Sequence, residues 1–193
     1  ARENFTDDLE AINTVRQAVG EQTKLMVDFN QSLTFDEALN RCHRLDDLNL
    51  TWIEEPLIYD NFEGYSRLTT DIKTPIQLGE NFYGPRELYK ALQMGASDLL
   101  MPDFMRIGGV SGWLKSAAIA EAAGIPISTH LYPEVGAHVM RVSQTAHWLE
   151  WLDWADEILK EPFTKVNSFI KIPDKPGLGI EWDEAAIAKY AYT

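Results

Sequence analysis

Hydrophobic and polar residues follow one repeating order along this chain: a short apolar run, a polar loop and a longer amphipathic stretch. The short runs have the length and the β-branched or aliphatic composition of buried strands, and each carries an acid or a histidine near its carboxyl end. The strands predicted in this way are residues 25–30, 51–56, 75–81, 98–103, 125–130 and 147–150.

The stretches between these runs have the apolar spacing of amphipathic helices. We expect helices over residues 6–19, 34–45, 62–68, 85–94, 113–123 and 135–142. Thr34 and Glu37 form a capping-box pattern, Pro85 suits a first helical turn, and Gly124 suits a helix end. The glycine-rich run 108–112 is expected to be a loop that leads into the helix at 113–123.

Strands that alternate with helices form a parallel sheet, and functional side chains at every strand end are typical of the (β/α)8 TIM-like barrel. Such a barrel needs eight strands and about 250 residues. This chain of 193 residues shows about six β/α units and begins inside a helix. We therefore expect an incomplete α/β barrel that lacks its first two strands, with an open doubly wound sheet as the competing fold. Residues 1–168 are the expected partial barrel and catalytic domain, and residues 169–193 a C-terminal segment that packs on the barrel or on a cap.

Composition excludes several classes of function. The formal net charge of −13 argues against a nucleic-acid partner, since phosphate binding requires clustered Lys and Arg. No apolar run reaches the length of a membrane span and no signal peptide is present, so we expect a cytoplasmic protein without a membrane partner. Cys42 is the single cysteine, which excludes an internal disulfide and a multi-cysteine zinc site.

Three acids follow three successive strands at equal intervals of 26 residues: Asp28, Glu54 and Glu80. An isolated acid at a loop is usually solvated, but three at one strand–helix period favour a shared site. An all-oxygen set of carboxylates suits a hard cation, and Mg²⁺ fits best. Glu55 is equally compatible with a supporting role beside this site and with exposure to solvent.

The next two strands end in Asp103 and His130. A carboxylate that orients a histidine ring and raises its basicity makes a general base, so we interpret this pair as a catalytic dyad. His43 is expected at the surface and His138 in helix packing, and His147 receives no role.

Six sequence runs carry a resemblance to a known family: VDFNQSL, TWIEEP, LGEN, MPDFMRIGG, STHL and AHWLE. In order and spacing they resemble the mandelate racemase subgroup of the enolase superfamily, over nearly the whole chain. The resemblance implies that Asp28, Glu54 and Glu80 bind Mg²⁺, and that Asn30 contacts the substrate hydroxyl. It further implies that Asp103 and His130 form the base, and that Glu150 hydrogen-bonds the substrate carboxylate.

The activity implied by this resemblance is Mg²⁺-dependent removal of the proton α to a carboxylate, through an enediolate. Racemisation of a 2-hydroxy acid is the reaction we expect, with dehydration of an acid sugar or an inactive truncated fragment as alternatives. The expected partners are a small-molecule carboxylate substrate and further copies of the chain in a homo-oligomer.

The sequence also departs from the family pattern. No Lys-x-Lys pair follows a strand, the capping N-terminal domain of the family has no counterpart, and Arg106 stands where relatives carry lysine. Racemisation requires a base on each face of the carbon. The chain as given is therefore expected to be inactive without its N-terminal part.

Overall fold

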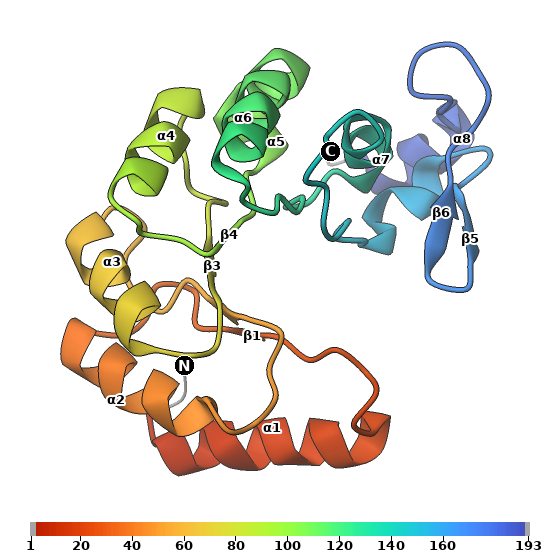
Figure 1. The fold of residues 1–193 in the computed structure, drawn as a ribbon. Coiled ribbons are helices and arrows are strands. Elements are labelled where there is room, and N and C mark those ends of the chain that lie inside the picture. The colour runs from red at the N-terminus through yellow and green to blue at the C-terminus, as the bar shows by residue number, and fades with distance from the viewer. Residues whose placement is uncertain (1–2, 192–193) are drawn as a thin grey trace.

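Four parallel strands form the central sheet, in the order in which they occur along the chain (Figure 1). They are β1 (Val27–Asp28), β2 (Ile53–Glu54), β3 (Ile76–Leu78) and β4 (Leu99–Leu100). The structure is a computed structural model that describes residues 3–191. The outermost residues of both expected domain ranges, 1–2 and 192–193, lie outside the described residues.

Two further segments continue this sheet beyond β4 as isolated parallel bridges. Leu100 pairs with Ile127, Asp103 pairs with His130, and Ile127 pairs in turn with Ala146. These bridges fall in or beside the expected strands 125–130 and 147–150. The six strand segments therefore lie side by side in chain order, as the sequence pattern predicts.

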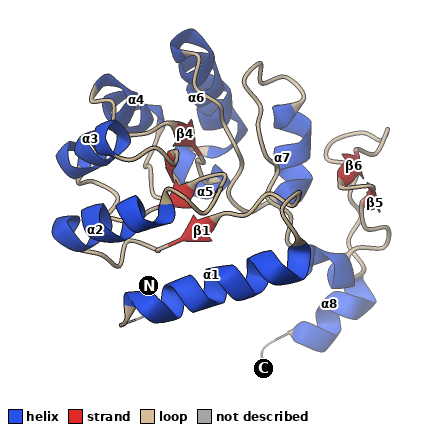
Figure 2. Cartoon of the chain, turned by 60° about the horizontal axis from the view of Figure 1, so that its bottom comes forward, coloured by secondary structure: helices blue, strands red, loops and turns tan. Residues whose placement is uncertain are grey.

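Helices cover the outside of these strands as an arc (Figures 1 and 2). The helices are α1 (Phe5–Val19), α2 (Phe35–Leu45), α3 (Phe62–Asp71), α4 (Pro85–Gln93), α5 (Phe104–Ile107), α6 (Gly109–Ala123), α7 (Pro133–Met140) and α8 (Glu184–Tyr190). The capping box at Thr34 and Glu37 is formed, Pro85 begins α4, and Gly124 ends α6 in the left-handed conformation.

The expected loop at residues 108–112 is wrong. A one-turn helix, α5, ends at Ile107, and α6 begins at Gly109 without a loop between them. The glycines are required by close packing: a Cβ on Gly112 would lie 1.9 Å from the Ile107 carbonyl oxygen, and Gly108 has a φ of 101°. Phe104 and Trp113 then stack with ring centroids 5.0 Å apart.

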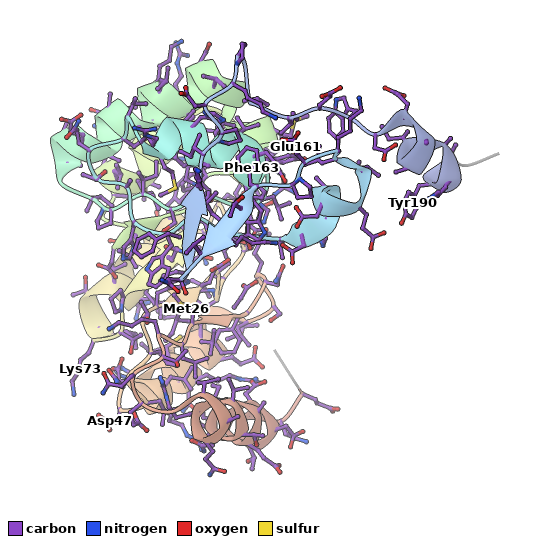
Figure 3. All side chains as sticks on the ribbon, turned by 90° about the vertical axis from the view of Figure 1, so that its right-hand side faces the viewer. Met26, Asp47, Lys73, Glu161, Phe163 and Tyr190 are labelled. Atoms are coloured by element: carbon purple, nitrogen blue, oxygen red, sulfur yellow. The ribbon has the colours of Figure 1, made fainter. Side chains whose placement is uncertain are left out.

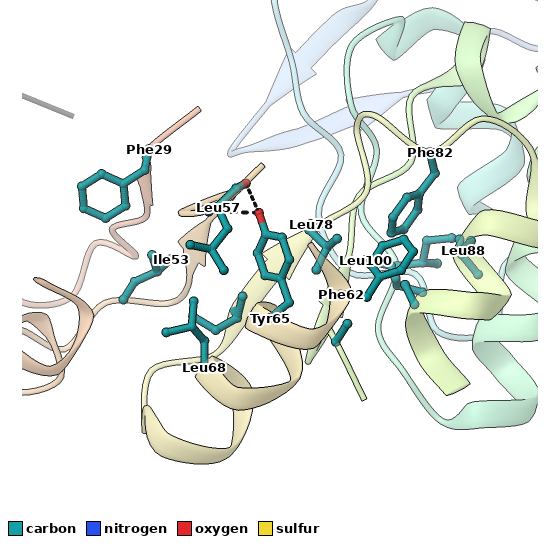
Figure 4. Close-up of a cluster of buried hydrophobic side chains, with 14 of the residues drawn as sticks. Phe29, Ile53, Leu57, Phe62, Tyr65, Leu68, Leu78, Phe82, Leu88 and Leu100 are labelled. Atoms are coloured by element: carbon teal, nitrogen blue, oxygen red, sulfur yellow. Dashed lines mark hydrogen bonds between the residues drawn. The ribbon is translucent and has the colours of Figure 1, made fainter. Parts of the chain in front are cut away.

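The hydrophobic core fills the space between the sheet and the surrounding helices (Figure 4). Ile53 and Ile76 stand in register on β2 and β3 and are fully buried. Tyr65 of α3 is also fully buried, and its hydroxyl accepts a hydrogen bond from the Leu57 backbone N–H at 3.2 Å and donates one to the Leu57 carbonyl. Side chains alternate in direction along a strand, so the other face of the sheet is free for polar residues.

The C-terminal part packs more loosely. It contains the 3-10 helix η1 (Asp153–Ile158) and an antiparallel hairpin of β5 (Thr164–Val166) and β6 (Phe169–Lys171). Leu159 and Phe163 are its buried apolar residues, and Figure 3 shows α8 with Tyr190 at the periphery. His138 of α7 anchors the segment through its Nε2, 3.0 Å from the Leu178 carbonyl oxygen. No helix among residues 3–191 is long and apolar enough to cross a membrane.

Candidate active site

The acids of β1 and β2 stand at the same height in the sheet. Asp28 pairs directly with Glu54, and the residue in register on β3 is Gln77. Glu80 lies three residues beyond Gln77, after Gly79, whose φ is 139°. The three acids therefore lie at neighbouring strand ends, and Glu80 lies further toward the carboxyl end of its strand than Asp28 and Glu54 do.

Each of these acids is held by a hydrogen-bond donor of its own. The Asn30 backbone N–H and side-chain amide both donate to Asp28, the former at 2.7 Å. The Trp52 indole N–H donates to Glu54 at 2.9 Å. The Asn81 amide donates to Glu80 at 3.1 Å. Within residues 3–191, no three His, Cys, Asp or Glu side chains converge as a ready-made metal site.

Burial and like charge make this group of acids unfavourable as bare anions. Burial raises the pKa of Glu54 to about 7, and the charges of Asp28, Glu80 and Glu150 add to the effect. Burial and the charge of Glu80 raise the pKa of Glu55 to about 8. A divalent cation would compensate these charges, and carboxylate oxygens on adjacent strands about 4.8 Å apart are a donor set that fits Mg²⁺.

Glu55 is a buried residue rather than a solvated acid, with 1% of its surface exposed. Its carboxylate accepts from the Asn81 amide at 3.0 and 3.3 Å, and the same amide reaches Glu80. Sequence reasoning missed Asn81. The signal was present, because an amide directly after a strand-end acid can bridge two carboxylates.

Asp103 and His130 form the expected pair. The His130 Nδ1 lies 2.8 Å from Asp103, whose other oxygen accepts from the backbone N–H groups of Met105 and Arg106. Burial alone would raise the pKa of Asp103, but these hydrogen bonds outweigh it and the pKa lies below its usual value. Burial alone would lower the pKa of His130. The Asp103 bond and the charges of Glu80 and Glu150 outweigh that effect, so this pKa is raised.

The dyad and the acids of the first strands meet at Glu80. The His130 Nε2 lies 3.2 Å from a Glu80 oxygen, so the ring bridges Asp103 and Glu80. Arg106 donates to the Glu80 carbonyl at 2.9 Å, and its guanidinium lies 3.9 Å from the carboxylate. Arg106 is therefore the cation closest to this edge in the part of the chain that the structure describes.

Glu150 lies beside His130 at the end of the last strand segment. Its carboxylate accepts a hydrogen bond from the Leu131 backbone N–H, and its own N–H donates to the Thr129 hydroxyl at 2.9 Å. The structure thus brings Glu150 to the same edge as the dyad, while Asn30 lies against Asp28 at the opposite end of the row.

Left-handed backbone occurs directly after three of these strands, at non-glycine residues. Asn30 follows Asp28 with a φ of 47°, Glu55 follows Glu54 with a φ of 35°, and Leu131 follows His130 with a φ of 52°. Such conformations cost about 1–3 kcal/mol each and gather at functional sites. Their position supports the assignment of this edge as the site.

A cavity of about 310 Å³ lies between the segments that follow His130 and Glu150. Leu131 and Tyr132, which follow His130, form one wall, and Leu152 and Trp154 form another. The remaining lining residues are Pro133, Glu134, Ala155 and Ile158. The cavity is therefore largely apolar and partly aromatic.

Residues 1–186 match the family described as enolase C-terminal domain-like. The chain belongs to this family. The resemblance inferred from the sequence is confirmed, and the arc of strands and helices is part of a TIM-barrel-like α/β fold.

The curated relatives of this chain are named for several different reactions. The L-talarate/galactarate dehydratase of Salmonella typhimurium is 33% identical over 183 residues, which cover 95% of this chain and 46% of that protein. The D-galactarolactone cycloisomerase of Agrobacterium fabrum is 30% identical over 201 residues, which cover 95% of this chain and 53% of that protein. The chain spans about half the length of the relatives it matches.

Solved structures match more closely. An enolase from alpha pretobacterium bal199 with bound magnesium is 60% identical, with a TM-score of 0.96 over 98% of this chain and 52% of that one. An enolase from Bradyrhizobium, complexed with magnesium and mandelic acid, is 45% identical, with a TM-score of 0.95 over 100% of this chain and 53% of that one.

Proposed function

We propose that this chain carries the metal ligands and one acid–base pair of a Mg²⁺-dependent enzyme that removes the proton α to a carboxylate. The observation that carries the proposal is a group of acids at neighbouring strand ends, of which Glu54 is buried, joined through Glu80 to a histidine–aspartate dyad. Asp28, Glu54 and Glu80 would hold Mg²⁺. When bound, the cation supplies positive charge that stabilises the enediolate form of the substrate.

His130 is the general base in this proposal. Asp103 fixes its Nδ1, so its Nε2 faces the strand-end acids and is the nitrogen that exchanges a proton with the substrate carbon. The raised pKa of His130 suits a base that must hold the proton until it is returned.

Glu150, in its protonated form, is the proposed hydrogen-bond donor to the substrate carboxylate. It lies next to His130 but is held by the Leu131 N–H rather than by the acids of β1 to β3. A hydrogen bond that strengthens as charge develops on the carboxylate accelerates the chemical step without tightening substrate binding. Asn30, which donates to Asp28, would contact the substrate hydroxyl.

The largely apolar cavity between the segments that follow His130 and Glu150 favours a 2-hydroxy acid with an apolar or aromatic substituent. Leu131, Leu152, Ala155 and Ile158 make most of the lining apolar, and the ring of Trp154 adds aromatic surface. Racemisation of such a 2-hydroxy acid is therefore the reaction we propose. The mandelic acid in the Bradyrhizobium complex is a substrate of this class and is the first compound to test.

Dehydration of an acid sugar is the second candidate, because relatives 33% and 30% identical are named as dehydratases. In that reaction His130 would protonate a departing β-hydroxyl. Substrates with an apolar substituent have no β-hydroxyl to lose, so the two candidates are separated by their products.

We further propose that segments outside these 193 residues complete the barrel, cap the site and supply a second base. Support comes from the six neighbouring strand segments and from relatives about twice as long. Residues 1–168 would then form the partial barrel and catalytic domain, and residues 169–193 would pack against the barrel or its cap.

Deuterium uptake from heavy water tests the proposal in the intact protein. Mandelate of each hand is incubated with and without Mg²⁺, and the α-proton is followed together with optical rotation. Racemisation that requires Mg²⁺ is expected. Dehydration of galactarate without exchange of mandelate would replace the racemase assignment by the dehydratase one, and the absence of both would remove the proposal.

A further inference from the structure

The same three-residue pattern occurs on two strands of the sheet. Trp52 directly precedes the β2 residues Ile53 and Glu54, and Trp148-Leu149-Glu150 belongs to the last strand segment. Residues two apart in a strand point to the same face. Glu54 and Glu150 therefore each have a tryptophan two residues before them on the same face.

The two tryptophans touch, although their strands are not neighbours. β3, β4 and the segment 125–130 lie between β2 and the segment that carries Trp148. The ring centroids of Trp52 and Trp148 are nevertheless 6.4 Å apart, in an edge arrangement. His147 completes the contact, with its ring centroid 6.0 Å from each tryptophan. The contact therefore crosses the inside of the arc, below the edge that bears the acids.

Trp52 also contacts the site directly. It is 6% exposed, and its indole N–H donates to Glu54 at 2.9 Å. Because the ring is wedged against His147 and Trp148, the N–H has one direction in which to point. On the opposite strand, the Trp148 carbonyl accepts from the Thr129 N–H at 3.0 Å, and the Thr129 hydroxyl accepts from the Glu150 N–H.

We propose that Trp52 and Trp148 are positioning residues. Their contact across the arc sets the separation of Glu54 from Glu150, and the indole N–H of Trp52 orients Glu54 for Mg²⁺. The inference rests on the proposed function. It adds to that function two residues to which no contact with substrate or metal is assigned. A partner in the outer shell of a metal site that fixes a ligand's orientation typically changes metal affinity by about 10–100-fold when removed.

Trp52→Phe keeps a ring in place and removes the N–H. Mg²⁺ titration of the intact protein by calorimetry is expected to show about tenfold weaker binding. Trp148→Leu leaves the N–H of Trp52 intact but removes its aromatic support, and we expect about threefold weaker binding. In the double variant, Trp148→Leu should weaken Mg²⁺ binding less than it does in the wild-type background, because the two tryptophans act through one contact.

Trp113→Phe is the matched control. Trp113 is fully buried and its indole N–H donates to the Ser143 hydroxyl at 3.0 Å, so this substitution also removes a buried N–H. It is expected to lower the thermal midpoint and leave Mg²⁺ affinity unchanged. If the role of Trp52 were only structural, Trp52→Phe would, like Trp113→Phe, lower the thermal midpoint and leave Mg²⁺ affinity unchanged.

Tryptophan fluorescence gives a second readout that does not depend on activity. Mg²⁺ should change the emission of the wild-type protein and of Trp113→Phe, and this change should be absent in Trp52→Phe. Mg²⁺ affinity of Trp52→Phe within about twofold of wild type, or an equal loss in Trp113→Phe, would overturn the inference alone. A wild-type protein that binds no Mg²⁺ would overturn both it and the proposed function.

Discussion

The two halves of the strand-end edge balance charge in opposite ways. At the ends of β1 to β3, Asp28, Glu54, Glu55 and Glu80 gather negative charge, and burial drives the pKa of two of them to about 7 and 8. At the following strands, a carboxylate and a histidine meet at 2.8 Å and each shifts the other toward its charged form. The first half carries four acids against Arg106, whose guanidinium lies 3.9 Å from Glu80, whereas the second half pairs Asp103 with His130.

This difference separates two tasks. A group of carboxylates without compensating charge suits a site that is completed by a metal ion, whereas a self-compensated pair can take up and release a proton. Glu80 touches both halves, through Asn81 and His130. Substitutions on the two sides of Glu80 should therefore have distinct signatures, and the predictions below test that separation.

The largest expected effect is on proton exchange. His130→Asn should slow deuterium exchange of one mandelate enantiomer in the intact protein by at least about a thousandfold, because a general base contributes about 10²–10⁴-fold. The other enantiomer should still exchange through the second base that we place outside these residues. His43→Asn, at a half-exposed side chain on α2, is the control. Equal loss for both enantiomers would contradict the one-face assignment.

Glu150→Gln should lower kcat by several orders of magnitude while the substrate KM changes little, as expected when an interaction strengthens in the transition state. Mg²⁺ affinity should stay near the wild-type value, since Glu150 is held by the Leu131 N–H rather than by the acids of β1 to β3. Loss of substrate binding with the chemical step retained would assign Glu150 to binding instead.

Stability should depend on pH through the first half of the edge. The folded-state pKa values of Glu54 and Glu55, about 7 and 8, lie above the ordinary 4.5, so the folded chain binds these protons more tightly than the unfolded one. The folding stability that these two protonated side chains contribute is fully present below pH 4.5 and is lost as pH rises through 7 to 8. Urea unfolding without Mg²⁺ should show this decline, and saturating Mg²⁺ should reduce it. A rise in stability over the same interval without Mg²⁺ would be the opposite of this prediction.

The smallest effect is expected at the junction of the halves. Arg106→Lys should reduce kcat about two- to fivefold, because a lysine keeps the charge near Glu80 and loses the fixed geometry of the guanidinium. Arg86→Lys, on α4, provides the comparison. A loss as large as that of His130→Asn would place Arg106 in the chemistry itself.

Much of this arrangement is readable from the sequence because it depends on local pattern. The apolar runs and the acids that end them are separated by helices with clear caps, so the strand order and the shared edge follow from the alternation. Capping at Thr34, Pro85 and Gly124 was predictable for the same reason. The pairing of Asp103 with His130 follows once consecutive strands are known to be neighbours.

Other features depend on contacts between distant residues. The position of Glu80 relative to Glu54 depends on the register of β3, in which Gln77 and not Glu80 pairs with Glu54. The contact between Trp52 and Trp148 depends on the curvature of the sheet, which brings strands together that the pattern alone keeps apart. The glycine-rich run 108–112 predicts a loop from the sequence, because the close approach of α6 to Ile107 leaves no trace in hydrophobic spacing.

One crossed measurement tests the central claim, that the two halves of the edge do separable work. Mg²⁺ affinity is measured by calorimetry for wild type, Glu54→Gln and His130→Asn of the intact protein, with Glu63→Gln on α3 as a control. Glu54→Gln should weaken Mg²⁺ binding by more than about a hundredfold, beyond the effect of removing an outer-shell partner. His130→Asn should weaken it by no more than about tenfold, the lower end of the effect of losing an outer-shell contact, here that of its Nε2 with Glu80. Equal losses in Glu54→Gln and His130→Asn, or wild-type affinity in Glu54→Gln, would contradict the account.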